Sequence, residues 1–247
     1  MKTHAVTDIG LVRHENQDAY KILELPERNG LLAVVCDGMG GAAGGRVASE
    51  LAANAFADAM QEFLFAPDFA EEEISLHKNC SEAVYRANRE VFDRSVITPD
   101  LKGMGTTLTA ALLLGNRLYT ANVGDSRIYL LRDMKFTRLT HDDSYVQTLI
   151  DSGRLTEEEA EMHPRRNILT RAVGTKPYTE FGFESFSLCP GDRLLLTSDG
   201  LTTCVREGEI AALLTAVRKT DEAANALVAA AKSKGGPDNI TVVIIDI

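Results

Sequence analysis

Four aspartates stand where an apolar stretch of the chain meets a turn: Asp37, Asp125, Asp199 and Asp238. The apolar stretches are residues 31–36, 118–123, 194–198 and 240–245. Because strand ends in a sheet protein converge on one rim, these side chains are expected to gather there. Carboxylates gathered in one place repel each other unless divalent cations neutralise them. The pattern therefore predicts a metal-dependent hydrolytic site.

The glycine-rich segment Asp37–Gly41 follows an apolar stretch and precedes a helix, so a dinucleotide-binding turn must be considered. Such a turn binds pyrophosphate through bare N–H groups at a helix N-terminus, where an anionic Asp37 would repel it. The ribose-binding acid, about 20 residues further on, would fall inside a helix near Ala57 or Asp58. The segment instead favours metal ligation, because its glycines leave the Gly38 carbonyl free as a ligand.

The early segment Arg13–Ala19 brings a guanidinium and a carboxylate into one predicted loop. The planar fork of Arg13 suits a phosphate dianion, and Asp18 can orient a metal-bound water. By itself this segment also fits an ordinary solvated loop. Together with the four aspartates it indicates phosphate chemistry.

The cysteine spacing shows neither a zinc pattern nor a disulfide framework: Cys36, Cys80, Cys189 and Cys204. Arg86 follows Cys80 at the spacing of a cysteine-dependent phosphatase loop. That loop needs glycines to aim backbone N–H groups at phosphate, whereas residues 82–94 have the spacing of an amphipathic helix. The cysteines are predicted to be reduced thiols that pack as small hydrophobes.

Length and composition limit the possible classes of protein. With 247 residues, of which 45% are hydrophobic and 25% charged, a single domain over residues 1–247 is expected. The formal net charge of -10 and a pI of about 5.0 argue against a nucleic-acid surface. The apolar runs are far shorter than the ~18 residues of a membrane helix, and residues 1–10 carry no signal-like apolar region. A cytoplasmic protein that does not bind membranes is expected.

Short β-rich segments are predicted at residues 31–36, 106–114, 117–123, 127–131, 181–187, 193–197 and 240–245. Helical spacing predicts two pairs of helices, at about residues 46–65 and 71–95 and at about residues 207–218 and 221–234. Helix pairs between runs of hairpins imply an α+β protein in which helices cover antiparallel sheets. The polar segment 142–177, with a short helix at residues 145–151, is predicted to be a flap beside the site.

In their order and spacing, these motifs resemble the type 2C metal-dependent protein serine/threonine phosphatases, in the short bacterial form. The matching segments run nearly end to end: residues 13–19, 37–41, 105–107, 124–127, 163–164, 166–167, 170–172, 198–200 and 236–239. The resemblance implies a four-layer α-β-β-α sandwich, in which two antiparallel sheets are flanked by helix pairs. It also implies that metals bind in a channel between the sheets.

The resemblance implies ligands for two Mn²⁺ or Mg²⁺ ions. Asp37 would bridge the ions. Asp199 and Asp238 would complete one ion, and the Gly38 carbonyl would help to hold the other. Asp125 and Asp199 match the residues that bind a third, weaker ion in bacterial members. Two ions ~3.5 to 4 Å apart lower the pKa of a bridging water and neutralise charge during in-line attack on phosphorus.

The same resemblance gives Arg13 the role of clamping the phosphoryl oxygens, and Asp18 that of holding a coordinated water. The chain departs from the family at three places. Met39 stands where many eukaryotic members have a histidine as candidate general acid, so the leaving group is protonated by metal-bound water or is not assisted. Gln17 stands in place of a glutamate, and residues 142–144 read Asp-Asp-Ser where members often read Asp-His-Ser.

Together these observations predict a Mn- or Mg-dependent enzyme that hydrolyses phosphoserine and phosphothreonine in proteins through a metal-bridged water. Phosphoproteins and a cognate bacterial serine/threonine kinase are the expected partners. A pseudophosphatase that only binds phosphoproteins is one alternative, although none of the metal carboxylates is lost. A two-metal phosphodiesterase or nuclease is another, disfavoured by the acidic composition. Arg127 is expected to be a structural ion-pair partner, and the five histidines to have surface or packing roles.

Overall fold

The computed structural model describes residues 1–247, apart from the side chains of Ala42 and Ala43. Its strands are β1 (Lys2–Asp8), β2 (Asp18–Leu25), β3 (Gly30–Met39), β4 (Gly105–Thr106), β5 (Leu108–Leu114), β6 (Arg117–Val123), β7 (Arg127–Arg132), β8 (Lys135–Arg138), β9 (Gly182–Ser187), β10 (Arg193–Thr197) and β11 (Ile240–Asp246). Its α-helices are α1 (Gly41–Leu64), α2 (Glu73–Ile97), α3 (Tyr145–Asp151), α4 (Glu157–Glu161), α5 (Asp199–Thr202), α6 (Glu207–Ala216) and α7 (Thr220–Ser233).

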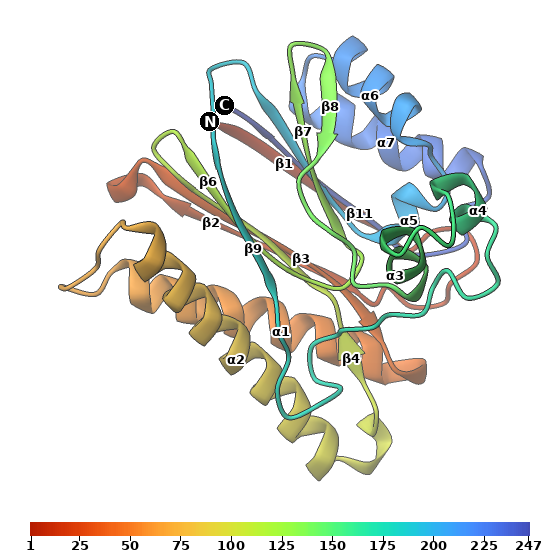
Figure 1. The fold of residues 1–247 in the computed structure, drawn as a ribbon, viewed down its shortest axis with the longest axis horizontal. Helices are drawn as coiled ribbons and strands as arrows, with labels where there is room; N and C mark the ends of the chain where they lie inside the picture. The colour runs from red at the N-terminus through yellow and green to blue at the C-terminus, as the bar shows by residue number, and fades with distance from the viewer.

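The strands form two sheets that pack face to face (Figure 1). The five-stranded sheet has the order β1-β11-β10-β7-β8, and the six-stranded sheet has the order β2-β3-β5-β6-β9 with β4 beside β3. Neighbouring strands run antiparallel in every ladder. This topology rules out the parallel βαβ unit of a dinucleotide-binding turn.

Helices cover the outer face of each sheet. The pair α1 and α2 lies on the six-stranded sheet, and the pair α6 and α7 lies on the five-stranded sheet (Figure 1). The predicted α+β class and the four-layer α-β-β-α sandwich are therefore confirmed. The four predicted long helices correspond to α1, α2, α6 and α7.

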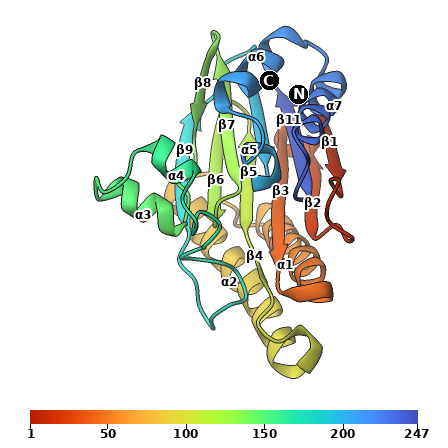
Figure 2. The same ribbon diagram turned by 90° about the vertical axis from the view of Figure 1, so that its right-hand side faces the viewer.

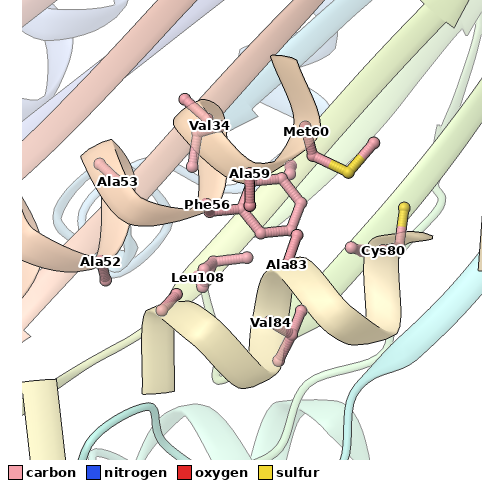
Figure 3. Packing of buried hydrophobic residues seen from close by; sticks show 14 of the residues in the cluster. Val34, Ala52, Ala53, Phe56, Ala59, Met60, Cys80, Ala83, Val84 and Leu108 are labelled. Carbon is pink, nitrogen blue, oxygen red and sulfur yellow. The ribbon is translucent and has the colours of Figure 1, made fainter. Parts of the chain in front are cut away.

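Strand β3 shows how its sequence builds these layers. Successive side chains of a strand point to opposite faces. Leu32 and Val34 enter the apolar cluster beneath α1 and α2, whereas Leu31, Ala33 and Val35 enter the cluster between the two sheets. Figure 3 shows Val34 together with helix residues of the first cluster. Burial on both faces explains why this strand reads as a continuous apolar run, as central strands do.

The sequence patterns do not predict β1, β2 and β8. All three strands lie at sheet edges, where one or both faces meet solvent, so they lack a long apolar run. The predicted strand 106–114 is interrupted at Thr107, which separates β4 from β5. Helix α1 begins at Gly41, earlier than the predicted residue 46, because a glycine-rich start has low helix propensity and its sequence resembles a loop.

The flap, residues 142–177, leaves the sandwich beside the turn between β6 and β7, where Asp143 is hydrogen-bonded to Gly124. It contains α3 and α4, which Figure 2 shows standing to one side of the sheets. The Ser144 side chain caps α3, and Thr156 with Glu159 forms a capping box on α4. The short helix predicted at residues 145–151 is confirmed. Within the described residues, no helix combines the length and apolar character needed to cross a membrane.

Candidate active site

Asp37 lies near the end of β3, where its backbone is held on both sides. Its N–H donates to Thr107 Oγ1 at 2.8 Å, and its carbonyl accepts from Thr107 N and Thr106 Oγ1, both at 2.9 Å. Directly opposite on β2 is Asp18. The backbone contacts leave the Asp37 side chain free to act at the rim of the sheet.

Asp18 connects the two sheets. Its Oδ2 accepts hydrogen bonds from Ser198 Oγ and Thr241 Oγ1, both at 2.7 Å. Thr241 belongs to β11, and Ser198 directly follows β10, so both donors come from the five-stranded sheet. The side chain is buried, and its Oδ1 has no hydrogen-bond partner.

Asp199 and Asp238 are carried to the same rim by strands of the five-stranded sheet, β10 and β11. Asp199 is the first residue of α5 after β10, and its Oδ1 is buried without a hydrogen-bond partner. Asp238 precedes β11 and accepts from Arg13 Nη2 at 2.7 Å through its Oδ2. Its Oδ1 accepts from the Asn239 N–H at 2.8 Å. Arg13 therefore lies directly against one of the predicted metal-binding carboxylates.

Asp125 joins this group from the turn between β6 and β7. Gly124, just before it, has φ +104°, and an added Cβ there would lie 2.6 Å from the Thr107 side chain. The turn is thus pressed against the segment that holds Asp37. Burial raises the pKa of Asp125, and the charges of Asp199 and Asp142 add to the effect.

Burial and mutual repulsion make these carboxyl groups hard to ionise. Burial raises the pKa of Asp37 well above its usual range, and the charges of Asp18 and Asp199 add to the effect. Burial is also the largest cause for Asp18, whose pKa is raised to about 7. The pKa values of Asp125 and Asp199 are raised as well, first by burial and then by neighbouring aspartates. Such a cluster attracts positive charge.

Close packing between β3 and α1 requires a glycine at position 38. Its N–H donates to the Gln17 carbonyl at 3.1 Å, and an added Cβ would lie 2.0 Å from the Gly45 carbonyl oxygen at the start of α1. The backbone of β3 and the first turn of α1 can meet only if this residue is glycine. This close approach is a second reason for the glycine besides the predicted use of its carbonyl as a ligand.

The donor atoms fit a divalent cation. Buried carboxylate oxygens without a partner are costly. A cation would satisfy Asp199 Oδ1, and a water bound to a cation would satisfy Asp18 Oδ1. The gathered donors are all oxygens, which suits hard cations such as Mg²⁺ and Mn²⁺.

The side chains are not arranged as a closed ligand set. Among the side chains that the structure describes, no group of three or more His, Cys, Asp or Glu residues could hold a metal ion as it stands. The guanidinium of Arg13 occupies Asp238 Oδ2. A cation at Asp238 would therefore share Oδ2 with Arg13 or replace it there.

The flap is attached to the Asp125 turn through Asp143. The Asp143 N–H donates to the Gly124 carbonyl at 2.9 Å, and Asp143 Oδ2 accepts from the Gly124 N–H at 3.1 Å. Arg171 at the far end of the flap donates its Nε to Asp143 Oδ1 at 2.8 Å. The aspartate that stands in place of the family's histidine thus pins both ends of the flap to the site.

Arg127 has the structural role that the sequence suggested. Its Nη2 lies 2.6 Å from Asp142 Oδ2, and its Nη1 donates to Tyr129 Oη at 3.1 Å. The guanidinium is therefore occupied beside the flap and does not face the carboxylate cluster as a free cation. His14 and His141 are exposed, and His141 pairs with Asp151 at 3.0 Å.

The cysteine alternative is wrong on geometry. Cys80 is buried on α2 in the same cluster as Phe56 and Met60 (Figure 3). Burial raises the pKa of its thiol to about 12. Arg86 is paired with Glu62 and Glu82 on the outer surface. A buried thiol of this kind cannot act as a thiolate nucleophile.

Sequence reasoning missed the polar residues that support the site. Thr107, Ser198 and Thr241 hold the backbone of Asp37 or the side chain of Asp18, and Asn239 holds the loop that carries Arg13. The hydroxyl residues sit in or next to apolar runs, where they read as ordinary strand residues. Thr107, Ser198 and Asn239 lie in the segments that match the phosphatase family, and this match is the signal that could have found them.

Fold and site together define a class of protein: a two-sheet sandwich with buried carboxylates suited to divalent cations and an arginine suited to phosphate. This is the class of the metal-dependent phosphohydrolases. The family model of protein phosphatase 2C matches residues 13–232, and the chain belongs to this family.

Known proteins agree along the whole chain. The chain is 40% identical to the serine/threonine phosphatase stp of Listeria monocytogenes serotype 4b (strain F2365), over 97% of this chain and 93% of that protein. The crystal structure of the Mycobacterium tuberculosis serine/threonine phosphatase PstP/Ppp superposes with a TM-score of 0.87 at 40% identity, over 100% of this chain and 98% of that one. The catalytic domain of PstP in complex with two manganese ions gives a TM-score of 0.85 at 39% identity, over 99% and 97%. The predicted family and enzyme class, a protein serine/threonine phosphatase, are confirmed.

Proposed function

We propose that this chain hydrolyses phosphoserine and phosphothreonine in proteins and that the reaction depends on Mn²⁺ or Mg²⁺. The observation that carries this proposal is the partly buried aspartate cluster, in which the buried atoms Asp18 Oδ1 and Asp199 Oδ1 have no hydrogen-bond partner. The PstP catalytic domain, similar over nearly its whole length, binds two manganese ions. Divalent cations of this kind would supply positive charge that offsets the repulsion between the aspartates of the cluster.

The predicted ligand set is retained as part of the proposal. Asp37 would bridge two ions, with Asp199 and Asp238 completing one of them and the Gly38 carbonyl helping the other. Asp125, with Asp199, would hold a third and weaker ion. When bound, the ions lower the pKa of a water molecule and neutralise charge on the reacting phosphoryl group.

Asp18 orients rather than binds in this proposal. Its Oδ2 is fixed by Ser198 and Thr241, which leaves Oδ1 as an acceptor for a water hydrogen. A carboxylate anchored in this way keeps a water in one orientation without loss of side-chain entropy during the reaction.

Arg13 is placed to bind the phosphoryl group. About half of its side chain is exposed, 51%, so a substrate can reach it. Among the described side chains, its only ion-pair partner is Asp238. Because the guanidinium has five N–H donors, it can hold a phosphoryl group through the donors that Asp238 does not use. This contact ties the substrate to the carboxylate cluster.

No side chain is proposed as general acid. Met39 follows Gly38 on β3 and has no proton to donate. The Met39 side chain therefore cannot protonate the serine or threonine oxygen that leaves. This oxygen is expected to be protonated by metal-bound water or to leave without assistance.

The expected substrates are phosphoproteins, and the expected counterpart is a serine/threonine kinase that phosphorylates them. We place the reaction in the cytoplasm, because the four cysteines are free in the structure and reduced thiols are typical of that compartment. The acidic net charge of -10 makes nucleic acid an unsuitable partner.

The test is phosphate release from a phosphoserine peptide by the purified chain, with Mn²⁺ or with EDTA. Activity that requires Mn²⁺ supports the proposal. Tight binding of the peptide without release of phosphate would identify the pseudophosphatase alternative. Faster cleavage of a phosphodiester than of the phosphopeptide would identify the phosphodiesterase alternative.

A further inference from the structure

Asn239 makes an unusual set of contacts for the residue that follows a metal-binding aspartate. Its side chain is buried, and all of its hydrogen bonds go to backbone atoms of one loop. Oδ1 accepts from the Gln17 N–H at 2.8 Å, and Nδ2 donates to the carbonyls of Ile9 at 2.9 Å and Glu15 at 3.0 Å. Only an amide can accept once and donate twice here, so aspartate or leucine would leave buried backbone groups unpaired.

The loop that Asn239 holds is the one that carries Arg13. Residues 9–17 contain neither helix nor strand, so the loop has no ladder of its own to fix its position. Ile9 and Glu15, two of the contact points, lie on either side of Arg13 in the sequence. Asn239 therefore holds the loop both before and after the arginine.

Close backbone packing supports the same arrangement. Gly10 has φ +79°, and an added Cβ would lie 2.2 Å from the Asp238 carbonyl oxygen. The Leu11 N–H donates to the Gly236 carbonyl at 2.8 Å. The Arg13 loop is thus pressed against the segment 236–239 along its first half.

Asn239 also touches the third part of the site. An added Cβ on Gly200 would lie 1.9 Å from the Asn239 carbonyl oxygen, so the Asp199–Gly200 turn packs on the Asn239 backbone. One residue therefore contacts the loop of Arg13, the turn of Asp199 and its own neighbour Asp238.

We propose that Asn239 is a positioning residue that fixes the Arg13 loop relative to the aspartates of the site. This inference rests on the proposed function. The half-exposed Arg13 side chain has a single ion pair, which is worth little at such exposure. The position of Arg13 must therefore be fixed by the backbone of its loop. A fixed loop lets the arginine bind a phosphoryl group without a large loss of conformational entropy.

A double-mutant cycle tests this role. In the otherwise wild-type protein, Asn239→Ala is expected to lower kcat/KM for a phosphoserine peptide about tenfold; in the Arg13→Ala background the same change is expected to have less than about a twofold effect. Mn²⁺ affinity, measured by calorimetry without substrate, is expected to stay the same in Asn239→Ala. A reduction of equal size in both backgrounds, or a loss of Mn²⁺ affinity, would overturn the proposal.

Asn88 provides a matched control for stability. It is a buried asparagine on α2 that also holds backbone groups of a loop, through Gly174 N–H at 2.8 Å and the Lys176 carbonyl at 3.0 Å. Asn88→Ala is expected to lower Tm, and its effect on kcat/KM is expected to be the same in the wild-type and Arg13→Ala backgrounds. If Asn239→Ala does not fold, Asn239→Ser is taken through the same cycle. An inactive wild-type enzyme would reject the proposed function, whereas an active wild type with additive variants would reject only this inference.

Discussion

Asp18 lies directly opposite Asp37 in the ladder between β2 and β3. Two carboxylates in this arrangement destabilise a sheet, and burial raises the pKa of both. Asp18 is held by hydroxyl groups of the other sheet, whereas contacts to Asp37 from Thr107 reach its backbone. The pair is thus divided into a fixed member and a member whose carboxyl group is available at the rim.

Asp37→Asn is expected to lower kcat more than tenfold, a loss above ~1.4 kcal/mol, because it removes charge from the centre of the cluster. Asp199→Asn and Asp238→Asn are expected to be nearly as harmful. The measurement is phosphate release at saturating Mn²⁺, with Asp58→Asn on the exposed face of α1 as a matched control. If Asp37→Asn kept more than about a tenth of wild-type turnover, the bridging role would be wrong.

Arg13→Ala is expected to raise KM for the phosphopeptide and to lower kcat/KM, because a charged contact to the phosphoryl group is lost. Mn²⁺ binding should survive, since Arg13 is not a ligand. Calorimetric titration of Mn²⁺ into the variant checks this point, and Arg89→Ala on α2 serves as the control. A large loss of Mn²⁺ affinity would assign the Arg13 loop to the metal site.

Cys80→Ser is expected to leave activity unchanged apart from a modest loss of stability, because the thiol is buried and far from ionising. EDTA is expected to abolish activity, and added Mn²⁺ to restore it. The assay compares wild type and variant with and without EDTA. Full activity in EDTA would reject a metal mechanism.

The position of Met39 makes a prediction about the leaving group. If no side chain at this position donates a proton, the rate should depend on the pKa of the leaving group in a series of substituted phenyl phosphates. Met39→Ala should change the rate only modestly. Met39→His would introduce an acid with a pKa near 6.5 and should flatten the dependence. A flat plot for the wild type, with chemistry rate-limiting, would point to an acid elsewhere, first His14 or His141.

Asp192 gives a prediction for stability against pH. Burial raises its pKa, but hydrogen bonds from Arg132 and from the Cys189 N–H outweigh this effect and leave the pKa below its usual value. The resulting stability is present above the unfolded-state pKa of about 3.9 and is lost as the pH falls below it. Asp192→Asn should therefore lower the free energy of unfolding at pH 7 by on the order of 1 kcal/mol, with a corresponding fall in Tm. Below pH 4 the difference from the wild type should become progressively smaller. Thermal unfolding over this pH range measures the difference, and a Tm gap that widens in acid would contradict the assignment.

Strands can be predicted from the sequence where they coincide with long apolar runs. The central strand β3 is of this kind, and Asp37 at its end could be named with it, whereas the helix pairs are predicted from their helical spacing. Edge strand β1 could not be predicted, because none of its side chains is fully buried and its residues do not form an apolar run. The same limit applies to the supporting residues of the site. Thr241 and Ser198 become recognisable only when Asp18, far away in the sequence, is folded against them.

The pairing of β1 with β11 bears on how the protein is made. Residues near the two ends of the chain are neighbours in this ladder, Lys2 with Asp246 and Asp8 with Ile240, and Figure 1 shows the two termini together. Contacts of such long range form slowly, and during synthesis β1 cannot pair until β11 has left the ribosome. Asp238 arrives with that strand. A chain that stops before β11 therefore cannot assemble the carboxylate cluster, and phosphatase activity should appear only when β11 is present.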